Sequence, residues 1–216
     1  LEYRGYDSAG LALICEGALL VEKAAGKISQ LEAQLGHALP SAVTGIAHTR
    51  WATHGAPNTR NAHPHTDCTN TVAVVHNGII ENASILRAKL VEKGHTFRSE
   101  TDTEVLAHLV EEFYKGTLAE AVAAALREVE GTYGIAVVST KEPDTVVAAR
   151  LGSPLLVGVG NGENFVASDP SAILQHTRSV VYLGEGEIAV VTPTSYRLMD
   201  LKEMPLTKAV SQIEWD

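Results

Sequence analysis

Short apolar runs separated by polar and glycine residues recur along this sequence, and they predict β-strands. Near the amino end, Leu11–Ile14 and Ala18–Val21 flank Cys15-Glu16-Gly17, a pattern typical of a β-hairpin. Later runs are punctuated by Gly, Pro and Asp, the residues that favour turns. The other strands predicted in this way are Val43–His48, Thr71–His76, Ile135–Val138, Thr145–Ala149, Leu155–Val159, Asn164–Ala167, Val180–Leu183 and Glu187–Val191.

Apolar residues three and four positions apart predict helices between some of these strands. Ile28, Leu31 and Leu35 place one apolar stripe on a helix over Lys27–Leu39, which ends before Pro40. The run Ser99–Asp102 supplies capping oxygens and negative charge, both suited to the start of a helix. The remaining helices predicted are Ser84–Lys93, Asp102–Tyr114, Thr117–Glu130 and a short one near Ser171–His176.

The order of these elements favours an α+β fold. Most of the helices fall in the middle of the chain, while strands with hairpin-like spacing dominate its later part. A doubly wound parallel sheet needs regular alternation of strand and helix, which this pattern lacks. We therefore expect a layered αββα sandwich with antiparallel sheets, formed as one domain over residues 1–216.

Composition narrows the choice of partners. The net charge is −9 and no basic run occurs, which argues against nucleic acid, because a phosphate backbone is bound by clustered Lys and Arg. No apolar stretch approaches the ~20 residues that a membrane span requires. Cys15 and Cys68 are the only thiols, and two unmatched cysteines favour a reducing, cytoplasmic setting. We expect Cys15 to pack as a small apolar residue and Cys68 to be an exposed thiol.

Three polar segments interrupt the apolar pattern between residues 48 and 82. His48–Gly55 combines a guanidinium, an indole, hydroxyls and two imidazoles, and Asn61–His65 and His76–Asn82 follow it. Such groups are costly to bury without partners and serve packing poorly. Together they indicate the wall of a binding site for a small polar molecule.

The charges and donors in this wall suit an amino acid. Arg50 offers a planar fork of donors for a carboxylate, and Asp102 can hold an ammonium group. Asn77 and Gly78 place a side-chain amide beside an unobstructed backbone N–H, a pair that can stabilise an oxyanion in acyl transfer. This combination indicates hydrolysis of an amino-acid side-chain amide.

Each of these residues also has a purely structural interpretation. Arg50 could form a buried ion pair, Asp102 could cap a helix, and Trp51 could belong to the core. Asn77-Gly78 is by itself a typical type I′ hairpin turn. The functional interpretation therefore rests on the presence of all these residues together, and not on any one of them.

The sequence also contains candidate metal ligands and candidate nucleophiles. His63-Pro64-His65 could present two imidazoles to a metal, but no Cys-x-x-Cys or His-Glu-x-x-His pattern supports such a site. We therefore expect no metal and no cofactor. No Gly-x-Ser-x-Gly elbow is present, and neither cysteine has the neighbours of a nucleophile.

Several motifs in the same order resemble the class II glutamine amidotransferases. They are Tyr3–Gly10, His48–Gly55, Asn61–His65, His76–Asn82 and Ser99–Glu104, and the similarity continues through Gly152–Leu155 and Ala167–Asp169. Arg50–Gly55 together with Asn61–His65 is more similar to the branch that aminates a sugar phosphate than to the phosphoribosyl branch.

The resemblance implies a four-layer αββα N-terminal-nucleophile hydrolase sandwich with two antiparallel sheets. It implies an N-terminal cysteine that attacks the side-chain amide of L-glutamine, with its own α-amine as base. Glutamate is then released, and ammonia passes to a sugar-isomerase domain of a parent enzyme expected to be a homo-oligomer.

The resemblance also implies roles for residues of this sequence. Arg50 binds the carboxylate of glutamine and Asp102 its amine, while Asn77 and Gly78 form the oxyanion hole. The remaining roles concern residues near these: Trp51, Thr53 and His54 lie on the loop that closes over glutamine, Arg4 lies near the nucleophile, and His63 supports the wall.

This sequence differs from the family pattern at its start. It opens at Leu1, without the catalytic cysteine and first strand of the family, and it ends before any isomerase domain. These residues alone are therefore expected to be inactive. A non-catalytic module that binds an amino acid is the second hypothesis, the glutaminase domain of a phosphoribosyl enzyme another, and a histidine-based metalloenzyme the last.

Overall fold

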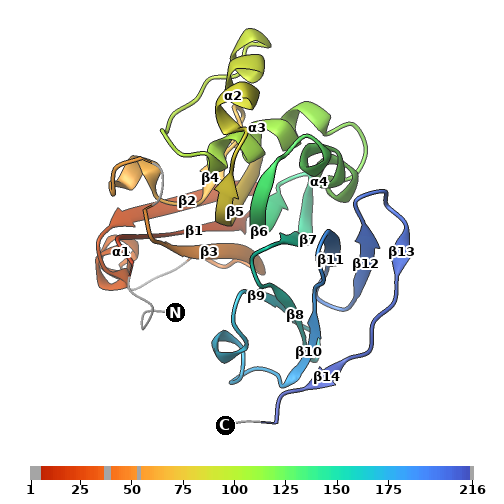
Figure 1. Cartoon of the computed structure of the whole chain (residues 1–216). Coiled ribbons are helices and arrows are strands. Elements are labelled where there is room, and N and C mark those ends of the chain that lie inside the picture. Colours follow the sequence, from red (N-terminus) through yellow and green to blue (C-terminus); the bar gives the residue numbers. More distant parts are fainter. Residues whose placement is uncertain (1–5, 37–39, 53–54, 215–216) are drawn as a thin grey trace.

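Helices and antiparallel sheets stack in four layers (Figure 1). The computed structural model describes residues 6–36, 40–52 and 55–214. Three helices, α2 to α4, cover one face of a large sheet, whose other face packs against a second β layer, and α1 covers the outside of that layer. This confirms the predicted α+β class and the αββα order of layers.

The helices follow the predicted positions with shorter bounds. They are α1 (Ile28–Leu35), α2 (Ala83–Glu92), α3 (Thr103–Phe113) and α4 (Leu118–Arg127), with 3-10 turns η2 (Thr59–Asn61) and η3 (Pro170–Ala172). A capping box fixes the start of α4, because Thr117 accepts from the backbone N–H of Glu120 and the Glu120 side chain accepts from that of Thr117. Only η3 forms where a helix near Ser171–His176 was predicted. None of the helices in the described ranges is long and apolar enough to cross a bilayer.

The large sheet lies in the centre of the molecule. Its seven strands, within the described residues, are ordered β13-β12-β11-β7-β6-β5-β4 and pair antiparallel throughout. Their bounds are β4 (His65–Thr66), β5 (Val72–Ile80), β6 (Gly131–Ser139), β7 (Glu142–Leu151), β11 (Glu187–Val191), β12 (Tyr196–Asp200) and β13 (Pro205–Leu206).

The second β layer consists of two smaller antiparallel sheets in the part of the chain that the structure describes. One is ordered β2-β1-β3 and the other β14-β10-β8-β9. Their bounds are β1 (Ser8–Cys15), β2 (Ala18–Ala25), β3 (Thr44–Arg50), β8 (Leu156–Val159), β9 (Asn164–Ala167), β10 (Ser179–Tyr182) and β14 (Ser211–Gln212). The expected pair of sheets is therefore observed as one large sheet and two smaller ones, with β3 and β9 as edge strands.

The largest apolar cluster lies between the helices and the seven-stranded sheet. It joins Leu106 and Val110 of α3 and Leu118 and Val122 of α4 to inward-facing strand residues such as Val137. A second cluster joins β1 and β3 to β5 and β6. The sheet is thus buried on both faces, which holds the ends of β3 and β5 and the start of α3 in fixed relative positions.

Two local predictions were wrong, and both concern residues of the candidate site. Asn77 and Gly78 form no hairpin turn: β5 continues through them and pairs with Gly134 and Tyr133 of β6. Asp102 precedes α3 but makes no side-chain cap hydrogen bond, because its Oδ2 accepts from the backbone N–H of Ile80 at 2.8 Å. Tertiary pairing overrides the local turn and cap preferences at these positions.

Candidate active site

A cavity of about 660 Å³ lies between the β layers, and it brings together residues from distant parts of the chain. Its walls include β3, the second half of β5, the start of α3 and the edge strand β9. Six of the nine predicted site residues line it: Arg50, Trp51, His63, Asn77, Gly78 and Asp102. The other three, Arg4, Thr53 and His54, lie outside the described residues.

Arg50 is the last residue of β3 and is only 4% exposed. Its two terminal nitrogens donate to the carbonyl oxygens of Ala56 and Gly55, at 3.5 and 3.3 Å. Burial lowers the pKa of Arg50, while the carboxylates of Asp7 and Asp102 act in the opposite direction. The loop after β3 thus surrounds a guanidinium that keeps a positive charge within the cavity wall.

Asp102 brings the opposite charge to the same cavity. It is 8% exposed, and its hydrogen bond to the Ile80 backbone ties the start of α3 to the end of β5. Arg50 and Asp102 are close enough for their charges to interact, and both line the cavity. A cation and an anion on one wall are complementary to a zwitterion, whose carboxylate and ammonium carry the matching charges.

The amide of Asn77 is oriented by a histidine. Nε2 of His48 donates to Oδ1 of Asn77 at 2.8 Å, because a carbonyl oxygen can only accept. Burial lowers the pKa of His48 to about 4, so its imidazole is neutral near pH 7. This contact leaves the two N–H groups of the exposed Asn77 amide available to a ligand in the cavity.

Gly78 occupies a backbone position that excludes a side chain. Its φ is 132°, and a Cβ there would lie 2.2 Å from the carbonyl oxygen of Thr132. The same carbonyl accepts from Nε2 of His76 at 3.1 Å, and Nδ1 of His76 accepts from the hydroxyl of Thr103 at 2.9 Å. Glycine is therefore required next to Asn77. The strand is held here by the contacts of His76 with Thr132 on one side and Thr103 on the other.

His63 lines the cavity beside His48. Its ring stacks on that of His48 with centroids 4.3 Å apart, and its Nδ1 accepts from the backbone N–H of His76 at 3.3 Å. Burial lowers the pKa of His63 well below the ordinary value, so two neutral rings stack here without repulsion. His65 lies beside it and contacts the hydroxyl of Thr101 at 3.0 Å, so these imidazoles have hydrogen-bonding roles.

Trp51 and Asp7 complete the described part of the site. Trp51 is 70% exposed at the rim of the cavity, so the structural interpretation of this residue as core is wrong. Asp7, which the sequence did not single out, accepts from the backbone N–H of Ala52 at 2.5 Å and from the Ser8 hydroxyl at 3.1 Å. Asp7 thus joins the segment after Arg50 to the start of β1. In the sequence, only its position inside the Tyr3–Gly10 motif indicated that it could belong to the site.

Neither cysteine contributes to the described cavity wall. Cys15 ends β1, and Cys68 lies between β4 and β5 beside His95 and His108. Both thiols are free and partly buried, so the prediction that Cys68 is simply exposed was wrong. The described residues that line the cavity therefore include the charged side chains of Arg50 and Asp102 and the Asn77 amide, but no thiol.

The chain belongs to the glutamine amidotransferase domain family, whose model matches residues 48–175. The four-layer sandwich is accordingly that of the N-terminal-nucleophile amidotransferases, as the resemblance implied.

Individual proteins agree with this assignment. The chain is 50% identical over 216 residues to the glutamine–fructose-6-phosphate aminotransferase (isomerizing) of Aquifex aeolicus, and 50% identical over 222 residues to that of Chlorobaculum tepidum. In both cases all of this chain but only 36% of the relative is covered, so the chain spans about a third of their length. The glutamine phosphoribosylpyrophosphate amidotransferase of B. subtilis, solved with ADP and GMP, shares the fold, with a TM-score of 0.78 at 24% identity over 93% of this chain and 44% of that one.

Proposed function

We propose that residues 1–216 form the glutamine-hydrolysing domain of a glutamine–fructose-6-phosphate aminotransferase, which releases glutamate and supplies ammonia for glucosamine-6-phosphate. The observation that carries this proposal is the placement of Arg50 and Asp102 on one cavity with Asn77 and Gly78. The full-length match of this chain to part of two such enzymes supports the choice of parent reaction.

The proposed binding mode follows from the charges. The Arg50 guanidinium binds the α-carboxylate of glutamine, and the Asp102 carboxylate binds its α-ammonium group. The side-chain amide then extends toward β5, where Asn77 N–H and the backbone of Gly78 receive the oxyanion of the tetrahedral intermediate. His48 holds Asn77 in the orientation that this role needs.

The remaining predicted residues act around the bound substrate. Trp51 lies at the rim of the cavity, where its indole can cover the ligand. Thr53 and His54 are assigned to the closing loop by resemblance alone. His63 positions the wall through His48. Arg4 is assigned to the neighbourhood of the nucleophile by resemblance alone.

We assign the nucleophile to an N-terminal cysteine of the whole protein. Its thiolate would attack the amide carbon of glutamine, and ammonia would leave after taking a proton from the α-ammonium group that served as base. Water would then hydrolyse the thioester to glutamate. Because neither Cys15 nor Cys68 reaches the cavity, residues 1–216 by themselves are proposed not to hydrolyse glutamine.

The proposed partner of this domain is the isomerase domain of the same enzyme, which consumes the ammonia, in a homo-oligomeric parent. A reducing compartment keeps thiols such as those of Cys15 and Cys68 free, which supports a cytoplasmic location. The amide hydrolysis described here involves no metal or cofactor.

The test is to assay the whole protein for glutamate release from glutamine and for glucosamine-6-phosphate formation with fructose-6-phosphate. The Asp102→Asn variant should lower kcat/KM for glutamine roughly 10–10²-fold, the value of a charge-assisted hydrogen bond, because Asn keeps the acceptor for Ile80 N–H but loses the charge. Binding of glutamine without glutamate release would instead support the amino-acid-binding module. Transfer to phosphoribosyl pyrophosphate but not to fructose-6-phosphate would support the phosphoribosyl branch.

A further inference from the structure

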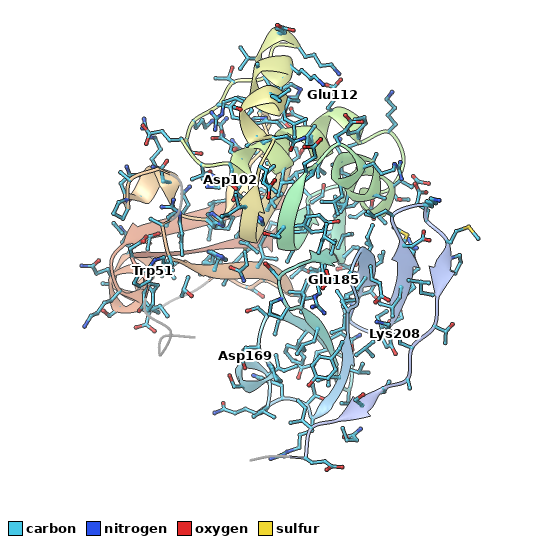
Figure 2. The ribbon with its side chains drawn as sticks, in the orientation of Figure 1. Trp51, Asp102, Glu112, Asp169, Glu185 and Lys208 are labelled. Carbon is cyan, nitrogen blue, oxygen red and sulfur yellow. The ribbon has the colours of Figure 1, made fainter. Side chains whose placement is uncertain are left out.

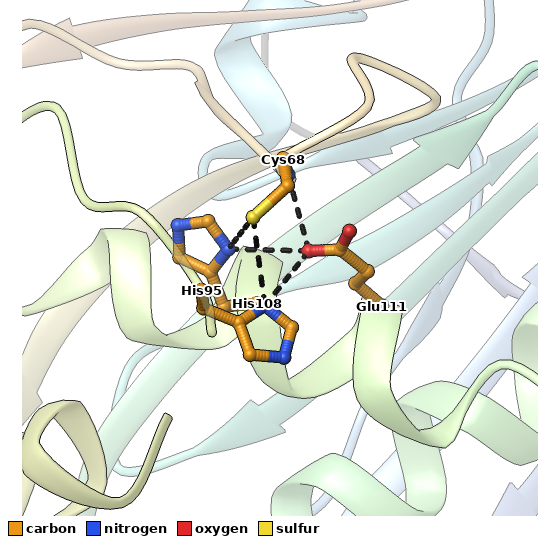
Figure 3. A group of neighbouring side chains, drawn as sticks. All are labelled: Cys68, His95, His108 and Glu111. Atoms are coloured by element: carbon orange, nitrogen blue, oxygen red, sulfur yellow. Dashed lines mark hydrogen bonds and ion pairs between the residues drawn. The ribbon is translucent and has the colours of Figure 1, made fainter. Parts of the chain in front are cut away.

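Four side chains with metal-ligating atoms meet beside α3, and none of them lines the cavity (Figure 3). Cys68 comes from the loop between β4 and β5, His95 from the loop between α2 and α3, and His108 and Glu111 from one face of α3. Their Sγ, Nδ1 and carboxylate oxygen atoms all lie within 4.8 Å of one another. Among the described residues, this is the group whose atoms gather closely enough to hold a metal ion.

Four of the six distances between these atoms are close to the edges of a metal-centred tetrahedron. Cys68 Sγ lies 3.6 Å from His95 Nδ1 and 3.5 Å from His108 Nδ1. Glu111 Oε2 lies 3.0 Å from the first of these nitrogens and 3.2 Å from the second. With ordinary zinc bond lengths, tetrahedral angles place sulfur and nitrogen ligands about 3.6 Å apart and nitrogen and oxygen ligands about 3.3 Å apart.

The outer hydrogen bonds direct lone pairs toward the centre of the group. Nε2 of His95 lies 3.2 Å from a carboxylate oxygen of Glu112, and Nε2 of His108 lies 3.4 Å from one of Glu104. A carboxylate accepts, so each Nε2 can carry the hydrogen, and in that tautomer Nδ1 faces the centre of the group with its lone pair. Ring N–H groups held by carboxylates in this way are typical of metal-bound histidines.

One ligating atom from each of the four side chains faces the same small volume. These atoms are Sγ of Cys68, Oε2 of Glu111 and the two Nδ1 atoms. Oε2 of Glu111 also accepts from the backbone N–H of Cys68 at 3.1 Å, a contact that a metal-bound carboxylate can keep.

The segments that carry the four side chains are held in place. Asp67 Oδ1 accepts from the backbone N–H groups of Thr71 and Val72 at 2.7 and 2.9 Å, which fixes the turn around Cys68. Arg98 donates to the Cys68 carbonyl at 3.1 Å. The His108 side chain is 1% exposed and the other three side chains are partly buried, so the cluster is held at a partly buried position.

We propose that Cys68, His95, His108 and Glu111 bind a structural zinc ion. One thiolate, two imidazoles and one carboxylate form a borderline-soft set that suits zinc, and four protein ligands leave no open position for substrate. The ion joins the β4–β5 loop and the α2–α3 loop to α3, the helix that begins after Asp102. This proposal departs from the expectation of no metal, which was based on short sequence motifs.

The test is a cobalt titration of the whole protein after treatment with a chelator. Wild-type protein should bind Co²⁺ with the intense visible bands of tetrahedral cobalt and a thiolate-to-cobalt charge-transfer band, and Zn²⁺ should displace it. The charge-transfer band should be lost in Cys68→Ser and retained in Cys15→Ser, the matched thiol on β1. Absence of tetrahedral cobalt in the wild type, or an unchanged spectrum in Cys68→Ser, would overturn the proposal.

A second measurement needs no variant and therefore does not depend on the folding of a mutant. Zinc at about 100-fold above its Kd should raise the Tm of the chelator-treated wild type by roughly 5–10 °C. An unchanged Tm in zinc would show that the cluster is a metal-free hydrogen-bonded network and would overturn the proposal.

Discussion

The cavity and the Cys68 cluster use polar side chains from neighbouring segments but arrange them in opposite ways. In the cavity, Arg50 and Asp102 carry opposite charges on one open wall, and the Asn77 amide keeps N–H groups for a ligand. In the cluster, four electron-pair donors converge within 4.8 Å. A positive and a negative side chain on one cavity wall are complementary to a zwitterionic molecule. Four electron-pair donors that face one small volume are suited to a single cation.

Helix α3 connects the two regions. Asp102 directly precedes it, while His108 and Glu111 lie further along the helix (Figure 2 labels Asp102 where α3 begins and Trp51 where β3 ends). The first eight residues of α3, from Thr103 to Val110, are buried. The proposed substrate-binding carboxylate therefore precedes this helix, and two of the proposed metal ligands lie further along it. The following predictions test that separation, from the largest expected effect to the smallest.

The largest effect is expected for Arg50→Ala in the whole protein. Removal of the guanidinium leaves the substrate carboxylate without its partner in a buried wall, so kcat/KM for glutamine should fall about 10²–10³-fold, mainly through KM. Glutaminase kinetics measure the change. Arg60→Ala, which removes an exposed arginine from the following loop, is the matched control. An unchanged KM in Arg50→Ala would remove this residue from the carboxylate site.

Asn77→Ala should act on the chemical step. Loss of one oxyanion donor is expected to lower kcat about 10²-fold with little change in KM. Steady-state kinetics separate the two parameters, and Asn161→Ala on an exposed loop serves as control. A normal kcat in Asn77→Ala would show that the amide held by His48 only supports the strand.

Acid should destabilise the wall of stacked histidines. Burial lowers the pKa of His48 to about 4 and that of His65 to about 3, both below the unfolded value of 6.5. Their contribution to stability is therefore complete above pH 6.5 and falls as the pH drops, by up to ~1.4 kcal/mol per pH unit for each histidine.

Urea unfolding at a series of pH values between about 7 and 5 measures this effect. His176→Gln is the control variant, because this side chain is 53% exposed. The free energy of unfolding should fall with pH in this variant as it does in the wild type. A free energy of unfolding that does not change over this range would contradict neutral burial of His48 and His65.

The smallest effect is expected for Cys68→Ser on catalysis. None of the four cluster residues lines the cavity, so kcat and KM for glutamine should stay within about twofold of the wild type under conditions where the protein is folded. The same variant should lose the cobalt charge-transfer band. A loss of activity as large as that in Arg50→Ala would show that the two regions are not independent.

Much of the fold was predictable because its signals are local. The bounds of β9 and β11 agree with the predicted strands, and the capping residues before α4 mark where that helix starts. Strands β4, β12, β13 and β14 were missed. Three of them have two residues, and so short a run carries no period and forms only through its neighbour. Asn77-Gly78 was predicted as a turn, because its continuation as a strand depends on pairing with β6.

The sequence by itself determined which chemical groups are present: the guanidinium of Arg50, the carboxylate of Asp102 and the amide of Asn77, together with the layered class of fold. Only the tertiary structure decided what each group faces. It placed His48 against Asn77, directed Asp102 to the Ile80 backbone, and brought Cys68 to two histidines distant in the sequence. The physical reason is the distance along the chain over which each effect acts. Propensity and periodicity act over a few neighbouring residues, whereas cavities and ligand clusters form between segments that meet only when the sheets and helices pack.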